Sequence, residues 1–353
     1  MTKETETNIE NINFWEAETP IRELSGGINP ASPENTYNMI KQDSTINALA
    51  RVSSKSGIVK RDFTTTGVIT TKNGNTDLQV IIEDYANVKL TQSTSKLLDK
   101  LIIDFTEKGN KKLIQIPLKE YMALNGLKDE KEARKRIKAD LEALHSITCT
   151  AYAGNKKDYI NFEIISERGI KNGVIFANFT DSIYSHLLNC KPMPYSKEIF
   201  KIPNKSPYGF YLSRKIHELK KMNQRDTVTA EKRESFNVSV KTLLEVCIKN
   251  GMPTYEEVQA TDRQVNARII EPFIRDLNIA SMPADKMIFE WHWCNAKGEE
   301  LKEDDAILAT ETAKGKYKAL EYKDWINKYI KITFAEDYPT AEPDKKKMPK
   351  KKK

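Results

Sequence analysis

The fold is decided by a nine-residue stretch that occurs twice along the chain. The first copy is Ile116-Pro117-Leu118-Lys119-Glu120-Tyr121-Met122-Ala123-Leu124, and the second is Val238-Ser239-Val240-Lys241-Thr242-Leu243-Leu244-Glu245-Val246. Most apolar positions match, and the lysine that follows each short strand is identical. Asn125-Gly126 and Asn250-Gly251 follow the two copies and predict where each helix ends. We interpret the stretch as a strand leading into a helix, present in both halves of the chain.

The elements around each copy are predicted to come in the same order. A helix precedes the copy, a long helix follows it, and a hairpin comes last. In the first half these are residues 94–108, 129–145, and 148–152 with 159–164; in the second half they are 207–222, 255–278, and a strand at 287–293 with a turn at Gly298. Further elements are predicted at residues 37–49 (a short helix), 68–71 and 78–82 (a hairpin), 113–116, 174–179 and 236–240 (strands), and 181–188 and 322–330 (helices). The repeated order predicts two domains of one kind.

The chain divides into four segments on this basis. Residues 1–60 are polar and contain Pro20, Pro30, Pro33 and Gly26-Gly27, and we expect a largely disordered arm. Residues 61–190 are predicted to be the first domain, and residues 191–334 the second. Residues 335–353 are predicted to be a disordered basic tail. The predicted fold class is α+β, with two tandem winged-helix domains between the flexible arm and the tail.

Composition agrees with this division. A length of 353 residues suits two domains, and 39% hydrophobic with 30% charged residues is typical of a globular protein. No apolar run approaches the ~18–20 residues that a membrane span needs, and residues 1–10 lack the apolar centre of a secretory signal. The four cysteines lie far apart without a CxxC pair, which argues against a zinc site and a disulfide framework. We therefore expect a cytoplasmic protein that has no membrane partner.

Charge is concentrated at one end of the chain. The net charge is +7, from 57 basic and 50 acidic residues, and seven lysines lie within residues 345–353. Without those lysines the balance is zero, so any strongly basic face on the folded part of the chain must come from uneven placement of charge. The tail either attracts phosphate without regard to sequence or is a solvated run of charge, and both interpretations remain open.

The first long helix has the pattern of a helix that contacts DNA. A helix–turn–helix places its second helix in the major groove, so one face must be cationic and the other apolar. Ala133, Ile137, Leu141 and Leu144 share one face, and lysines occupy the other. The candidate DNA-binding residues here are Lys128, Lys131, Arg134, Lys135 and Lys138, with Lys156 and Lys157 in the hairpin turn. The alternative is an ordinary solvated lysine face, since Glu130, Glu132 and Glu142 dilute the charge.

The second long helix carries side chains better suited to base reading. Arginine binds guanine and glutamine binds adenine through paired hydrogen bonds, whereas lysines mostly hold phosphate. The candidate residues opposite the buried stripe are Thr261, Gln264, Arg268 and Arg275, with Arg263 near the helix start. Pro272 predicts a kink or a restart inside this helix. The alternative is a surface helix with ordinary exposed arginine and glutamine.

The motifs of several enzyme classes are missing. A rolling-circle nickase holds its metal with a His-apolar-His pair, and none of the four histidines forms one. The phosphate loop GxxxxGK[ST] is also missing. We therefore expect no catalytic activity, no metal and no cofactor, and a nickase is disfavoured.

The two repeated halves resemble the tandem winged-helix domains of plasmid replication initiators of the iteron-binding Rep type. The resemblance lies in Leu118-Lys119-Glu120-Tyr121 with Asn125-Gly126 and Leu141-Glu142-Ala143-Leu144, and in the second copy followed by Ile269-Ile270-Glu271-Pro272-Phe273-Ile274-Arg275-Asp276-Leu277. It covers about residues 62–334. It implies a bacterial protein, associated with the nucleoid or a plasmid, that binds repeats at a replication origin on double-stranded DNA and recruits host replication proteins. It also implies a first domain that forms a homodimer and contacts phosphate, and a second that reads bases. A transcriptional repressor of a mobile element, and a structural or partitioning protein that binds DNA through its tail alone, are the alternatives.

Overall fold

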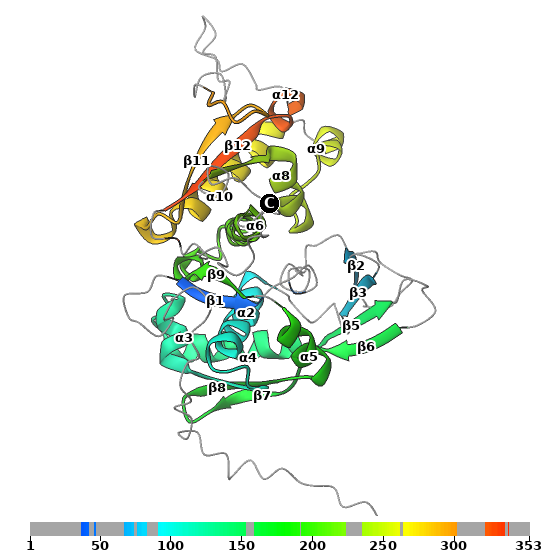
Figure 1. Cartoon of the computed structure of the whole chain (residues 1–353), viewed down its shortest axis with the longest axis vertical. Coiled ribbons are helices and arrows are strands. Elements are labelled where there is room, and N and C mark those ends of the chain that lie inside the picture. The colour runs from blue at the N-terminus through cyan, green and yellow to red at the C-terminus, as the bar shows by residue number, and fades with distance from the viewer. Residues whose placement is uncertain are drawn as a thin grey trace, which may run out of the picture.

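The computed structural model describes residues 37–41, 46, 67–73, 76–82, 91–152, 159–190, 192–223, 235–261, 264–301, 322–335 and 338. These residues form a mixed α+β fold with two lobes, one above the other in Figure 1. The first lobe comprises the elements up to β9, and the second lobe runs from α6 to β12. The α+β class predicted from the sequence is confirmed.

The first lobe is built around one long helix and a three-stranded sheet. Its repeated unit consists of α2 (Gln92–Glu107), β4 (Leu113–Pro117), α3 (Leu118–Leu124), α4 (Glu130–His145), β7 (Ile165–Lys171) and β8 (Val174–Phe179), and α5 (Asp181–Asn189) follows. The sheet has the strand order β4-β8-β7, and all its pairs are antiparallel. Leu101, Ile116, Ile137 and Phe179 are buried between these layers.

The second lobe repeats this arrangement. Its elements are α6 (Gly209–Asn223), β10 (Ser235–Ser239), α8 (Val240–Lys249), α9 (Tyr255–Thr261), the π-helical turn η3 (Asn266–Ile270), α10 (Glu271–Ser281), β11 (Phe289–Cys294), α12 (Tyr322–Ile326) and β12 (Tyr329–Phe334). The sheet order is β10-β12-β11, so the strand of the repeated stretch again lies at one edge, next to the last strand of the unit. Both lobes therefore share one topology.

The structure confirms the repeat that the sequence indicated. Ile116 and Val238 are buried at matching points of β4 and β10, and Leu118 and Val240 are buried at the starts of α3 and α8. The two helices also end in the same way. Asn125 Nδ2 donates to the Tyr121 carbonyl at 2.9 Å, and Asn250 Nδ2 donates to the Val246 carbonyl at 2.7 Å. The glycines that follow have φ of 65° and 95°, a left-handed backbone that favours glycine.

The hairpin of the first unit is not where the sequence analysis placed it. The strands predicted at residues 148–152 and 159–164 exist as β5 (Ile147–Tyr152) and β6 (Tyr159–Glu163), but they join β2 (Gly67–Asn73) and β3 (Thr76–Ile82) in a separate sheet of order β2-β3-β5-β6. The hairpin beside β4 is β7–β8, and β7 was not predicted. Residues 165–171 alternate imperfectly because β7 carries a register shift between Ile165 and Arg168.

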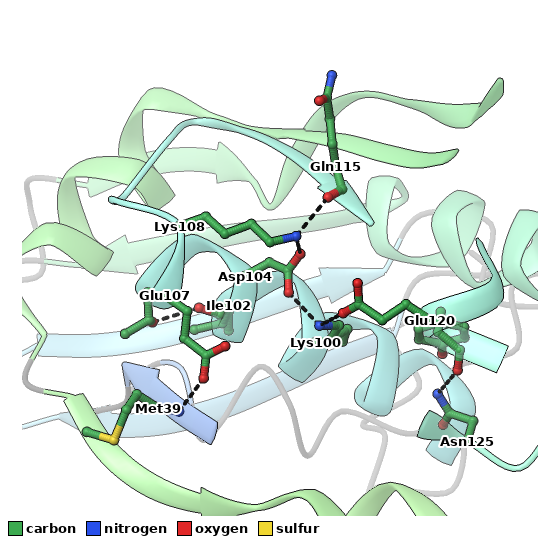
Figure 2. Close-up of polar contacts among 11 residues, drawn as sticks. Met39, Lys100, Ile102, Asp104, Glu107, Lys108, Gln115, Glu120 and Asn125 are labelled. Carbon is green, nitrogen blue, oxygen red and sulfur yellow. Dashed lines mark hydrogen bonds and ion pairs between the residues drawn. The ribbon is translucent and has the colours of Figure 1, made fainter. Parts of the chain in front are cut away.

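A strand forms at the start of the segment predicted to be a short helix at residues 37–49, and Ile46 within that segment is helical. β1 (Tyr37–Lys41) is buried along its whole length and pairs antiparallel with β9 (Pro192–Ser196). The backbone N–H of Met39 donates to Glu107 Oε1 at 2.7 Å, which fixes β1 against the end of α2 (Figure 2). Burial raises the pKa of Glu107 to about 7. These five residues of the predicted arm are thus part of the folded body, because a partner about 155 positions away supplies the pairing.

The helix predicted at residues 322–330 is shorter than expected. α12 ends at Ile326, and Tyr329–Phe334 form β12, the central strand of the second sheet. Ile330, Ile332 and Phe334 point into the core and alternate with partly exposed Lys331 and Thr333. That period of two is the strand signal that the sequence analysis missed.

Buried polar contacts join the two lobes. Asp99 of α2 accepts hydrogen bonds from Arg214 of α6, with Nη2–Oδ1 2.9 Å, and from the Tyr195 hydroxyl at 2.6 Å. Both charged side chains are 0% exposed. The ring of Tyr37 packs edge-on against Tyr338, with centroids 5.2 Å apart, so β1 also contacts the end of the second lobe. These contacts fix one lobe against the other.

Candidate DNA-binding surfaces

The first candidate surface is the outer face of α4. Asp129 caps this helix by accepting the N–H of Glu132 at 2.9 Å. Its inner face buries Ala133, Ile137, Leu141 and Leu144, as the spacing predicted. Hydrophobic burial of this stripe orients the helix, so the remaining side chains face outward.

The predicted cations of the first lobe are distributed as follows. Lys128, Lys131, Lys135 and Lys138 are exposed, and three of them share one face of α4. Arg134 is partly exposed and pairs with Glu130 at 2.7 Å within the same helix. Lys156 and Lys157 lie outside the described residues. The structure therefore places four of the lysines where they could meet a phosphate backbone, and it ties Arg134 to a carboxylate.

Buried polar groups hold α4 and α3 against α2. Asp140 accepts hydrogen bonds from Ser93 Oγ at 2.5 Å and from Thr94 Oγ1 at 2.7 Å, and burial raises the pKa of Asp140 to about 6. Lys100 lies between Asp104 at 2.6 Å and Glu120 of α3 at 2.5 Å (Figure 2). Burial lowers the pKa of Lys100, but the two carboxylates overcome this and raise it above the ordinary lysine value. The helix pair is thus fixed by specific partners as well as by its core.

The second candidate surface lies on the segment from α9 to α10. Thr254 and Glu257 cap α9 reciprocally: the Thr254 N–H donates to Glu257 Oε2 at 2.8 Å, and the Glu257 N–H donates to Thr254 Oγ1 at 3.3 Å. The single long helix predicted at residues 255–278 is divided into α9, a π-helical turn and α10. The N–H of Glu271, the residue before Pro272, donates a hydrogen bond to the carbonyl of Asn266, five residues back. Proline has no N–H and crowds the carbonyl four residues before it, which explains the restart that Pro272 predicted.

Gln264 and Arg268 are exposed together on this segment. The N–H of Arg268 donates to the Gln264 carbonyl at 3.0 Å, which places the two residues one turn apart. The buried side of the segment is formed by Val265, Ile269, Ile270, Phe273 and Leu277. Two side chains with the hydrogen-bonding groups needed for base edges thus project from one helical turn.

The other predicted residues of the second lobe are placed differently. Arg275 is 56% exposed, and its Nε donates to the buried Asp276 at 2.9 Å. Asp276 also accepts the Tyr208 N–H at 2.8 Å, so Arg275 is hydrogen-bonded to a carboxylate that has a structural role. Thr261 is the last residue of α9, and nothing is described of its side chain. Arg263 lies outside the described residues.

Sequence reasoning left out two arginines of the first lobe. Arg168 of β7 donates to Glu142 of α4 at 2.5 Å, which links the hairpin to the helix. Arg136 of α4 lines a cavity beside the segment that connects the lobes. Its position, one residue after Lys135, turns it away from the exposed lysine face. The sequence signal for this position was an arginine on the charged helix that lies outside both the lysine face and the buried stripe.

The described residues also bear on metal binding and membrane insertion. Within these residues, no group of three or more His, Cys, Asp or Glu side chains is placed to hold a metal ion. No helix in the described part of the chain has the length and apolar character needed to cross a membrane.

Comparisons with known proteins find distant likenesses of overall structure. No family model and no curated protein matches the chain. The chain is similar to a crystal structure of selenomethionine derivatives of domains 2 and 3 of RctB, with a TM-score of 0.42 and 10% sequence identity, over 82% of this chain and 98% of that one. A second crystal structure of RctB domains 2–3 is similar with a TM-score of 0.38 and 10% identity, over 80% of this chain and 96% of that one.

Proposed function

We propose that this protein binds double-stranded DNA in a sequence-specific way and initiates replication of a plasmid or another mobile element. In this proposal it binds repeats at the origin and recruits host replication proteins, without catalysing a reaction and without a metal or cofactor. The observation that carries the proposal is the joint exposure of Gln264 and Arg268 on one turn of a helix whose other side is buried. Such a pair supplies donors and acceptors for two neighbouring base edges.

The topology of each lobe supports the proposal. In each lobe a helix, an edge strand, a second helix, a further helical segment and two more strands of the same sheet follow in that order, and the last strand lies in the middle of the sheet. We interpret both lobes as winged-helix domains, in which α4 and the α9–α10 segment are the helices presented to the major groove. Two such domains in one chain can contact successive faces of a duplex, which agrees with the resemblance to plasmid replication initiators.

The chemistry of the two helices supports a division of roles. The outer face of α4 presents lysines, which hold phosphates and carry little sequence information. The second lobe presents glutamine and arginine, which read bases. We therefore assign base reading to the second lobe, and phosphate contacts and homodimer formation to the first.

A selection from a random duplex pool tests the proposal. The full chain is incubated with the pool in a chelator and without nucleotide, and the bound sequences are amplified and used in gel shifts. The expected result is one enriched motif that binds more tightly than random DNA. Failure to enrich any motif would contradict sequence-specific binding.

A second step separates an initiator from a transcriptional repressor. The enriched motif is placed as direct repeats next to an A·T-rich segment on a supercoiled plasmid, and unpaired thymines are detected with permanganate. An initiator that helps open the duplex produces reactive thymines beside the repeats. A repressor occupies the repeats and leaves the neighbouring segment paired.

A further inference from the structure

A cavity of about 170 Å³ lies between the α3–α4 turn and the segment that connects the lobes. Asn125 and Leu127 contribute from the turn, Arg136 from α4, and residues 201–204 from the connecting segment. Ser93 and Lys96, in the first turns of α2, also line it. The cavity therefore lies against the side of α4 that carries Arg136, where the chain passes from the first lobe to the second.

Hydrogen-bond donors and cations dominate the lining. Lys96, Arg136 and Lys201 bring three basic side chains, and Ser93, Asn125 and Asn204 bring neutral polar groups. No carboxylate is among the described residues that line the cavity. A partly open cavity with these groups suits an anion with several acceptor oxygens.

The charged form of Lys96 is destabilised by its burial in this cavity. Its side chain is nearly buried, and its Nζ donates to the carbonyls of Phe200 at 2.7 Å and Ile202 at 2.6 Å. Burial, and secondly the charge of Arg136, lower the pKa of Lys96 to about 7. A bound anion would offset both effects, because it would stabilise the charged form of Lys96.

Arg136 has donors to spare. Among the described residues no hydrogen bond or ion pair is formed by its guanidinium, which carries five N–H groups. The acidic groups nearby are already occupied: Asp140 accepts from Ser93 and Thr94, and Glu198 pairs with Lys201 at 2.8 Å. Lys201 is thus partly neutralised, and Arg136 with Lys96 supplies most of the attraction.

We propose that this cavity binds a phosphate group, held by Arg136, Lys96 and Lys201. The group can belong to the backbone of a bound duplex or to a free phosphate compound. For the duplex the inference deepens the proposed function and rests on it: the phosphate would come from the stretch of backbone between the parts of the site contacted by the two lobes.

Three single-charge variants of the full chain test the proposal. Arg136→Gln removes the unpaired guanidinium, and Lys201→Gln removes an exposed cation whose loss leaves the core intact. Lys111→Gln is the matched control, because Lys111 is exposed and lies beyond the other end of α2, a helix about 24 Å long whose first turns line the cavity. Each variant is melted in sodium phosphate and in sodium chloride of equal ionic strength, and titrated with duplex DNA at several salt concentrations.

The expected result in the melting experiment is a phosphate-specific rise in Tm for the unaltered protein and for Lys111→Gln. The rise should be smaller in Lys201→Gln and lost in Arg136→Gln. General stabilisation by phosphate acts on all four proteins alike, so only the difference between them counts. An equal rise in all four proteins, together with equal salt dependence of duplex binding, would overturn the proposal.

The duplex titration identifies the source of the phosphate. If the backbone occupies the cavity, the slope of log K against log salt falls by about 0.9 in Arg136→Gln and is unchanged in Lys111→Gln. If the melting difference is present but the slope is unchanged, the cavity takes a free phosphate compound. If the unaltered protein binds no duplex at all, the proposed function fails, and the melting experiment still decides the phosphate site.

Discussion

Replacing Asp99 with alanine should destabilise both lobes, although Asp99 belongs to the first. Its carboxylate accepts hydrogen bonds from Nη2 and Nε of Arg214 at 2.9–3.2 Å and from the Tyr195 hydroxyl at 2.6 Å. The side chains of Asp99 and Arg214 are both fully buried. Removing one partner of a buried pair leaves the other charge uncompensated, which costs about 3–5 kcal/mol. Arg214 lies on α6 of the second lobe, so the loss should be felt there directly.

Urea unfolding followed by tryptophan fluorescence measures this effect. Trp291, Trp293 and Trp325, the tryptophans that the structure describes, all lie in the second lobe. The fluorescence midpoint of Asp99→Ala should therefore fall together with the midpoint from circular dichroism. Asp181→Ala is the matched control: its carboxylate also forms an ion pair, with Lys112, but is 91% exposed, and its loss should cost less than about 1 kcal/mol. A fluorescence midpoint that stays unchanged in Asp99→Ala would refute the coupling between the lobes.

Three other changes to the chain have defined expected outcomes. Burial raises the pKa of Asp140 to about 6, so between pH 4 and pH 6 the carboxyl is protonated in the folded state and ionised in the unfolded state, and the free energy of unfolding falls as pH rises through that window. Asp140→Asn should remove up to about 3 kcal/mol of this pH dependence, measured by unfolding at several pH values, and an unaltered profile would contradict the prediction. Pro272→Ala restores a backbone N–H and should turn Gln264 and Arg268 relative to Phe273; binding-site selection should show weaker discrimination while the melt stays within about 1 kcal/mol, and unchanged discrimination would count against the role of the π-helical turn. Removing residues 345–353 should weaken binding to all sequences alike and flatten its salt dependence in gel shifts, whereas loss of discrimination would contradict a purely electrostatic tail.

Local patterns predicted most of the elements. The repeated stretch, the Asn-Gly helix ends and the buried stripe of α4 depend on neighbouring residues, and the structure has them where they were expected. Pro272 marked the restart of the second long helix for the same reason, because its effect on the backbone acts within one turn.

Strand partners distant in sequence were not predictable in this way. β1 pairs with β9, and β12 pairs with both β10 and β11, so the final state of these segments depends on residues far along the chain. The same limit applies to the candidate sites. Spacing predicted the exposure of Gln264, Arg268 and the α4 lysines. Only the fold shows that the Arg275 side chain donates a hydrogen bond to Asp276, and that Arg136 and Lys96 line one cavity.

The assignment of base reading to the second lobe is tested most directly by binding-site selection on single variants, with a thermal melt as control. Arg268→Ala and Gln264→Ala should each relax the preference at one base pair by ~1–3 kcal/mol and leave the fold intact, since both side chains are exposed. Lys135→Ala, on the exposed face of α4, should weaken binding to all sequences without changing the selected motif. A selected motif that changes in Lys135→Ala and stays the same in Arg268→Ala would show that the first lobe reads the bases.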